Sequence, residues 1–189
     1  PWRLPKVEDL VPIHTSFRTE AEGFAPFLRD ERLVRPWAVP GTPGLEHRIG
    51  GIEKEDVTGN ISYEPENHEH MTRTRQAKID KIADRLPPAQ IDGPPTGDVL
   101  IVGWGGTYGA LRQAAHQLRA EGHAVGHLHL RYLNPLQSNV GALLARYRRV
   151  VVAELNLGQL RSILRDKFLV DARGLNKIQG KPFKVREVV

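Results

Sequence analysis

The sequence has no cysteine among its 189 residues, few aromatic residues and no long apolar run. The lack of cysteine excludes disulfides, cysteine nucleophiles, thiolate-bound zinc and cysteine-ligated iron–sulfur clusters within this chain. Aromatic residues make up only 6% of the sequence, so it offers no stacking platform for single-stranded nucleic acid. No apolar segment approaches the roughly 18 residues that a membrane span needs. We expect no signal peptide, no membrane contact and a cytoplasmic location.

The charge is moderately basic, with a formal net charge of +5 at pH 7. A basic surface can bind nucleic acid or another anionic partner. The basic residues here are scattered along the chain, however, and do not form a stripe. The pattern favours a solvated surface that is partly covered in a larger assembly, and we expect no nucleic-acid partner.

The stretch from Gly97 to Gly109, GDVLIVGWGGTYG, predicts a strand, a glycine turn and a helix. Residues 99–102 are all apolar and mostly β-branched, which is typical of a strand buried on both faces of a parallel sheet. The glycines allow a tight turn, Thr107 can cap the next helix, and apolar residues then recur at helical spacing. Such a unit opens a doubly wound α/β domain.

Strands and helices continue to alternate after this unit, with short connections. We expect strands at 124–130, 149–154 and 169–178, helices at 139–147 and 158–167, and the start of a helix at 184–189. Parallel strands joined in this way need right-handed crossovers. The sequence therefore predicts an α/β domain over 97–189 with an open, mostly parallel sheet. The side chains expected to face inward with the helix at 158–167 are Leu157, Leu160, Ile163, Leu164 and Phe168.

The preceding residues do not predict a domain. Residues 1–66 are rich in proline and glycine and show no lasting apolar period, yet they hold too many large apolar side chains for a disordered tail. We expect an extended arm that packs on the α/β domain or on a missing domain. Residues 67–96 predict a helix, over about 68–86, whose apolar face includes Met71 and Ile82, and then a proline-rich linker.

The glycine turn invites comparison with a dinucleotide-binding fingerprint. Its spacing, Gly103, Gly105 and Gly109, is one residue longer than G-x-G-x-x-G, and the second strand ends on Arg131 without the acidic residue that would hold a ribose. An arginine there could suit a 2′-phosphate. We favour a simple strand–helix connection and keep the turn as a weak candidate anion site, formed by Gly105, Gly106 and Thr107.

The histidines give two further candidates. His68, Glu69 and His70 could contribute to a metal site, but no third ligand follows at a typical spacing, so an exposed helix start is favoured. His127 and His129 alternate along the second strand and would share one face, which indicates packing before catalysis. We expect His116 to be solvated.

A polar segment follows the third strand, at the sheet edge where open α/β domains place their sites. We favour a loop that docks on a partner over local helix capping, and both over catalysis. No nucleophile elbow, phosphate-binding loop or paired-carboxylate cleft is evident. The candidate interface residues are Glu154, Asn156, Gly158 and Gln159.

Six segments together carry a family resemblance: AVPGTPGLEHRIGG (38–51), NISYEPENHEHMTRTRQAKI (60–79), VGWGGTYG (102–109), LHLRYLNPL (128–136), VVAELNLGQL (151–160) and GKPF (180–183). The α/β part resembles the transketolase C-terminal-like domain. The chain as a whole resembles the end of the alpha subunit of the 2-oxoglutarate:ferredoxin oxidoreductases, which are thiamine-diphosphate 2-oxoacid oxidoreductases.

This resemblance implies an enzyme complex that oxidatively decarboxylates 2-oxoglutarate to succinyl-CoA and reduces ferredoxin. It also implies thiamine diphosphate, magnesium and an iron–sulfur cluster on other domains, with the remaining alpha-subunit domains and a beta subunit as partners. The diphosphate motif and the pyrimidine-binding domain are absent here, so we expect this chain alone to be inactive and to bind no cofactor or metal. The alternative is an independent α/β module that binds an anionic nucleotide such as NADP or CoA.

Overall fold

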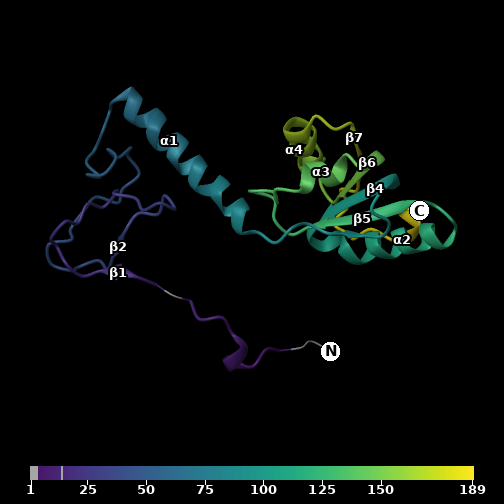
Figure 1. Ribbon diagram of the computed structural model, residues 1–189, viewed down its shortest axis with the longest axis horizontal. Coiled ribbons are helices and arrows are strands. Elements are labelled where there is room, and N and C mark those ends of the chain that lie inside the picture. The colour runs from purple at the N-terminus through teal and green to yellow at the C-terminus, as the bar shows by residue number, and fades with distance from the viewer. Residues whose placement is uncertain (1–3, 14) are drawn as a thin grey trace. The chain divides into compact units, whose positions relative to one another are not determined.

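A computed structural model describes residues 4–13 and 15–189 of the chain (Figure 1). The chain divides into two compact units, and the boundary falls between Lys78 and Ile79. This boundary lies inside helix α1 (Pro65–Asp80), close to its C-terminal end. No helix among the described residues is both long enough and apolar enough to cross a membrane.

The first unit is largely irregular before α1, as the sequence predicts. Its regular elements before that helix are a 3-10 turn at Val7–Asp9 and two short parallel strands, β1 (Phe17–Arg18) and β2 (Trp37–Ala38). The side chain of Asn67 on α1 holds the loop at residues 54–56 with two hydrogen bonds. It accepts from the Asp56 amide at 3.0 Å and donates to the Lys54 carbonyl at 2.9 Å. Local polar contacts therefore take the place of a periodic apolar core.

Helix α1 buries less than the sequence predicts. Met71 is fully buried, but Ile82 is 43% exposed. The α-helix ends at Asp80, and a 3-10 turn that contains Ile82 follows over Lys81–Arg85, ahead of Pro87 and Pro88. The expected apolar face is interrupted because the chain changes its helical geometry before reaching the prolines.

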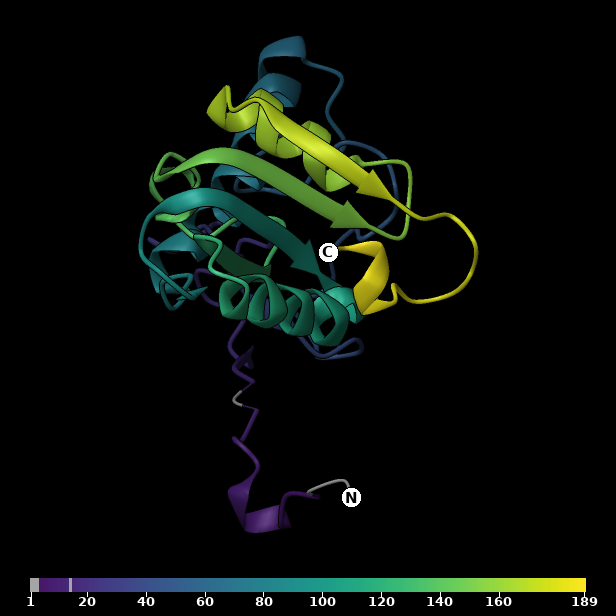
Figure 2. The ribbon, with the colours of Figure 1, turned by 90° about the vertical axis from the view of Figure 1, so that its right-hand side faces the viewer.

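The second unit is an open five-stranded sheet in the order β3-β5-β4-β6-β7 (Figure 2). All neighbouring strands are parallel except β3, which runs antiparallel to β5. The predicted mostly parallel α/β fold is therefore confirmed. The strands are β3 (Ile91–Asp92), β4 (Gly97–Trp104), β5 (Val125–Leu130), β6 (Tyr147–Glu154) and β7 (Ala172–Asn176), and the helices are α2 (Tyr108–Ala120), α3 (Val140–Leu144) and α4 (Gln159–Phe168).

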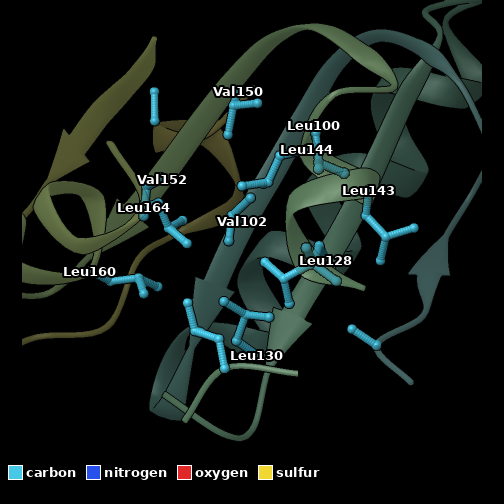
Figure 3. Close-up of a cluster of buried hydrophobic side chains, with 14 of the residues drawn as sticks. Leu100, Val102, Leu128, Leu130, Leu143, Leu144, Val150, Val152, Leu160 and Leu164 are labelled. Carbon is cyan, nitrogen blue, oxygen red and sulfur yellow. The ribbon is translucent and has the colours of Figure 1, made fainter. Parts of the chain in front are cut away.

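Helices cover both faces of this sheet. On one face, Leu111 and Ala115 of α2 pack with Ile101, Val125 and Phe183, which lies near the C-terminus. On the other face, side chains of α3 and α4 meet those of the central strands (Figure 3). Because both faces are covered, β4 is almost wholly apolar from residue 99 to residue 102, as a strand of a parallel sheet should be.

Strand β3 lies within the stretch that the sequence predicts to be a linker. Ile91 pairs with Leu128, and Ala89 before it is buried. The side chain of Asn139 completes the pairing of this segment, because it both accepts from the Ala89 amide and donates to the Ala89 carbonyl, each at 2.9 Å. A strand of two residues between prolines is too short to give a periodic signal.

The helix predicted over 139–147 is shorter than expected. Helix α3 covers Val140–Leu144, and Tyr147 already begins β6. The Tyr147 ring extends from β6 to Gly126 on β5, where a Cβ atom would overlap the tyrosine hydroxyl group. That hydroxyl group donates a hydrogen bond to the Pro94 carbonyl. Tyr147 falls on the helical period by coincidence, since its partners are strand and loop residues.

Helix α4 also departs from the prediction. Leu160 and Leu164 are buried, and Phe168 packs against the same core. Leu157 and Ile163, which the pattern placed inward, are 78% and 44% exposed. Leu157 precedes the helix in the loop, so the helical period does not apply to it. The C-terminal residues form a 3-10 turn, Val185–Glu187, in place of the expected helix start.

Candidate functional site

The strand order reverses at β4. The chain passes from β4 to β5 on one side, and then returns to β6 on the other. In open α/β sheets, ligands bind at this point, outside the carboxyl ends of the strands. Here β4 ends at Trp104 and β6 ends at Glu154. We therefore expect a ligand site, if the second unit has one of the usual kind, in the crevice between these two strand ends.

Side chains from the two strand ends are hydrogen-bonded to each other at this crevice. Glu154 is completely buried, and its Oε1 accepts from the Trp104 indole at 3.1 Å and from the Leu160 amide at 2.9 Å. Its Oε2 accepts from the Arg161 amide at 3.1 Å, and the Asn156 side chain also donates to Oε1, at 3.2 Å. Four donors thus meet one carboxyl group at the start of α4, so the acceptor capacity of Glu154 is used within the chain. The side chain of Arg161, whose amide is one of these donors, has a buried Nε without a hydrogen-bond partner.

Asn156 and Gly158 are also engaged locally. The Asn156 Oδ1 accepts from the Gly158 amide at 2.7 Å and from the Gln159 amide at 3.3 Å. Gly158 precedes α4 with φ at 99°, a conformation that favours glycine. Local capping, which the sequence analysis ranked second, thus occurs at Glu154 and Asn156. An interface role for the loop stays a prediction.

The same loop exposes apolar and polar groups to solvent. Leu155 is 38% exposed and Leu157 is 78% exposed, and Gln159 is also exposed. The exposure of these leucines escaped prediction because the helical pattern places Leu157 on the inner face of the helix. A usable signal existed in the loop itself, where leucine alternates with the polar residues that cap α4.

The glycine turn is a compact connection. Gly105–Thr107 form a 3-10 turn before α2, and Gly105 has φ at 57°. The Thr107 hydroxyl accepts from the Trp104 amide at 3.1 Å and donates to the Trp104 carbonyl at 2.9 Å, so it closes the turn and does not cap α2 as predicted. A Cβ atom added at Gly105 or at Gly106 would meet no atom of the chain within 4 Å beyond the neighbouring residues. An anion at this turn stays a prediction.

The histidine candidates separate into different settings. His68 and His70 on α1 lie 2.6 Å from Glu53 and 3.1 Å from Asp56, respectively. His116 is partly exposed and lies 3.4 Å from Asp92, so it is less free than expected. His127 is 1% exposed, which agrees with packing on the α2 face. Burial, with a smaller contribution from His129, lowers the pKa of His127 to about 4.

The cofactors that the resemblance implies do not fit these residues. A magnesium–diphosphate site needs clustered oxygen ligands, and among residues 4–13 and 15–189 no three His, Cys, Asp or Glu side chains are grouped to hold a metal ion. An iron–sulfur cluster needs cysteine thiolates, and the sequence has none. At the crevice itself, the side chains of Trp104 and Glu154 are hydrogen-bonded to each other.

Comparison with known proteins places the chain in a family. Residues 97–188 match the family of pyruvate:ferredoxin oxidoreductase core domain II. Over its whole length the chain is 50% identical to 2-oxoglutarate oxidoreductase subunit KorA of Mycobacterium tuberculosis, of which it covers 29%. It is 32% identical, over 93% of its length, to 2-oxoacid:ferredoxin oxidoreductase 1, subunit alpha, of Aeropyrum pernix, of which it covers 28%.

A solved structure agrees with these relatives. The 2-oxoglutarate:ferredoxin oxidoreductase of Magnetococcus marinus, with 2-oxoglutarate, coenzyme A and succinyl-CoA bound, matches 98% of the chain at 30% identity and a TM-score of 0.87, over 33% of its own chain. The chain belongs to the 2-oxoacid:ferredoxin oxidoreductase family and corresponds to part of its alpha subunit. It spans less than a third of the length of the curated relatives. The independent NADP or CoA module finds no support among them.

Proposed function

We propose that this chain is a non-catalytic, assembly-forming part of a 2-oxoglutarate:ferredoxin oxidoreductase. The observation that carries the proposal is the Trp104–Glu154 hydrogen bond, because it engages within the chain the polar groups at the strand ends where such a sheet would otherwise hold a ligand. The relatives support 2-oxoglutarate as the substrate of that enzyme, since one is named for 2-oxoglutarate and another has 2-oxoglutarate and coenzyme A bound. The complete enzyme would decarboxylate 2-oxoglutarate oxidatively to succinyl-CoA and reduce ferredoxin in the cytoplasm.

The chemistry of that enzyme would take place outside this chain. Thiamine diphosphate, magnesium and the iron–sulfur cluster would belong to the remaining alpha-subunit domains and to a beta subunit. The contribution of this chain would be placement, since small displacements between reacting groups cost large factors in rate. Its residues therefore matter to catalysis through the contacts they make with neighbouring domains.

Two surfaces are suited to such contacts. The loop after β6 combines the exposed Leu155, Leu157 and Gln159 with backbone amides that are hydrogen-bonded to the side chains of Glu154 and Asn156. In the first unit, Phe17 and Trp37 lie with their ring centroids 6.1 Å apart and are 43% and 57% exposed. Exposed apolar and aromatic groups of this kind are typical of subunit interfaces. We propose that both surfaces contact the other domains of the complex.

The proposal is tested by assembly. The chain would be co-expressed with the remaining alpha-subunit domains and the beta subunit, and the complexes would be weighed by native mass spectrometry. Leu157→Asp should reduce assembly at least about tenfold, because a charge would be buried at the contact. Leu169→Asp is the matched control, since Leu169 is 91% exposed and lies at the other end of α4. Equal assembly of both variants would refute an interface at this loop.

A further inference from the structure

A polar pocket of about 540 Å³ lies in the second unit, between β5, the beginning of α2 and the segment 87–92. Its volume is in the range of about 300–1,000 Å³ that is typical of small-molecule sites. Neither Trp104 nor Glu154 lines it, so it is separate from the crevice between the ends of β4 and β6. The assembly role proposed above does not use this pocket.

The wall of the pocket has unsatisfied polar atoms. Among the residues that the structure describes, four have a buried side-chain nitrogen or oxygen without a hydrogen-bond partner, and three of these line the pocket. They are His127 Nε2, His129 Nδ1 and Gln137 Oε1. Buried polar atoms nearly always have partners, because leaving them unpaired costs free energy. Their gathering at one cavity indicates that the partner is a molecule bound there.

The charges of the pocket favour an anion. Asp92 is its carboxylate, and it is already shared between Arg112 at 2.9 Å and Arg119 at 3.1 Å. Arg131, at the end of β5, is exposed and also lines the pocket. Burial lowers the pKa of both His127 and His129, so at neutral pH these rings serve as uncharged hydrogen-bonding groups. Two arginines, Arg112 and Arg131, therefore line the pocket against one carboxylate.

The aromatic groups of the pocket favour a planar ligand. The Tyr108 ring meets His129 edge-on at a centroid distance of 4.9 Å and lies 5.8 Å from His127. Tyr108 and Tyr132 are 46% and 40% exposed, so part of each ring is free to stack on a ligand. Uncharged ring nitrogens and an amide oxygen beside tyrosine rings can bind the edge of a heterocyclic base.

We propose that this pocket binds a small organic anion of nucleoside-monophosphate size, with its phosphate at Arg131 and its heterocycle against Tyr108. A turn of the His127, His129 and Gln137 side chains toward the pocket would let the base supply the partners that their buried atoms lack. The uncharged imidazoles can each donate or accept one hydrogen bond, so they set the orientation of the base, while the arginine supplies the attraction for the phosphate.

Titration of the 189-residue chain with AMP tests this proposal, with calorimetry for affinity and NMR of labelled histidine side chains for location. We expect saturable binding that shifts the resonances of His127 and His129. Arg131→Ala should weaken AMP binding by about tenfold or more, because a charge-assisted hydrogen bond to phosphate is lost. Adenosine, which lacks the phosphate, should bind the unaltered chain more weakly than AMP does, by a similar factor.

The matched control is Arg173→Ala, since Arg173 is an exposed arginine on β7, at the opposite edge of the sheet. It should leave AMP affinity unchanged, and thermal melting should show that both variants are folded. The proposal is overturned if AMP at millimolar concentration does not bind saturably, if both arginine variants bind alike, or if histidines other than these two respond. Binding to this chain but not to the complete alpha subunit would also overturn it, since the pocket would then be part of a contact between domains.

Discussion

At the scale of single residues, Glu154 joins three parts of the sheet edge. Its carboxyl group accepts hydrogen bonds from Trp104 at the end of β4, from Asn156 in the loop and from the first amides of α4. Each of these donors is a group that would be costly to bury unpaired. The residue that the sequence offered as an interface candidate therefore has a structural role of its own.

Glu154→Gln tests this role. The substitution places an amide group, a donor, opposite a shell made only of donors, so at least one backbone amide of α4 loses its acceptor. We expect the free energy of unfolding to fall by about 1–3 kcal/mol, measured by urea unfolding. Gln159→Ala is the control, since its exposed side chain should change stability by no more than about 0.5 kcal/mol. An unchanged unfolding midpoint for Glu154→Gln would contradict the network.

His127 gives a pH dependence. Its pKa is 6.5 in the unfolded chain and about 4 in the folded one. Between these values the unfolded chain binds a proton that the folded chain does not, so the free energy of unfolding should decrease as pH falls, by at most about 1.4 kcal/mol per pH unit. Above pH 6.5 the contribution is constant.

Urea unfolding at a series of pH values measures this effect. His127→Gln should give a shallower slope than the unaltered chain between the two pKa values, because the titrating group is gone. His123→Gln should keep the full slope, since His123 is exposed. Identical slopes for all three proteins would show that His127 titrates alike in the folded and unfolded chain.

At the scale of elements, clear apolar runs and helical spacings predicted strands and helices, whereas very short elements escaped prediction. The run at residues 99–102 identified β4, and the helical spacing after the glycine turn identified α2. Strand β3 depends on pairing with β5 and on the side chain of Asn139, fifty residues away from Ala89. Such long-range contacts leave no local trace in a sequence, and neither does the contact of the Tyr147 ring with Gly126.

Limited proteolysis tests the division into elements. The first unit lacks a periodic core, so local opening should expose it to protease before the sheet opens. We expect early cleavage before residue 65 and a resistant fragment that begins ahead of Ile91, because β3 is part of the sheet. The remaining alpha-subunit domains should slow cleavage of the arm. Mass spectrometry of the fragments would contradict this account if the arm were as resistant as the sheet before any partner is added.

At the scale of the whole molecule, the sequence predicts which sheet edge carries the polar residues of the candidate site. It does not predict the hydrogen bonds that these residues make with one another. The fold directed attention to the carboxyl ends of β4 and β6, and the polar residues after β6 were recognised there. The sequence could not show that Trp104 and Glu154, fifty residues apart, are hydrogen-bonded to each other at the crevice. Nor could it show that three polar atoms at one pocket lack partners, since burial depends on packing.

The most direct test of the assembly role is turnover by separated parts. Coenzyme A-dependent reduction of ferredoxin by 2-oxoglutarate would be measured for three preparations: this chain alone, the remaining alpha-subunit domains with the beta subunit, and all of them together. We predict turnover only for the third, in proportion to the complex found by native mass spectrometry. Turnover by this chain alone, or full turnover in its absence, would contradict the account.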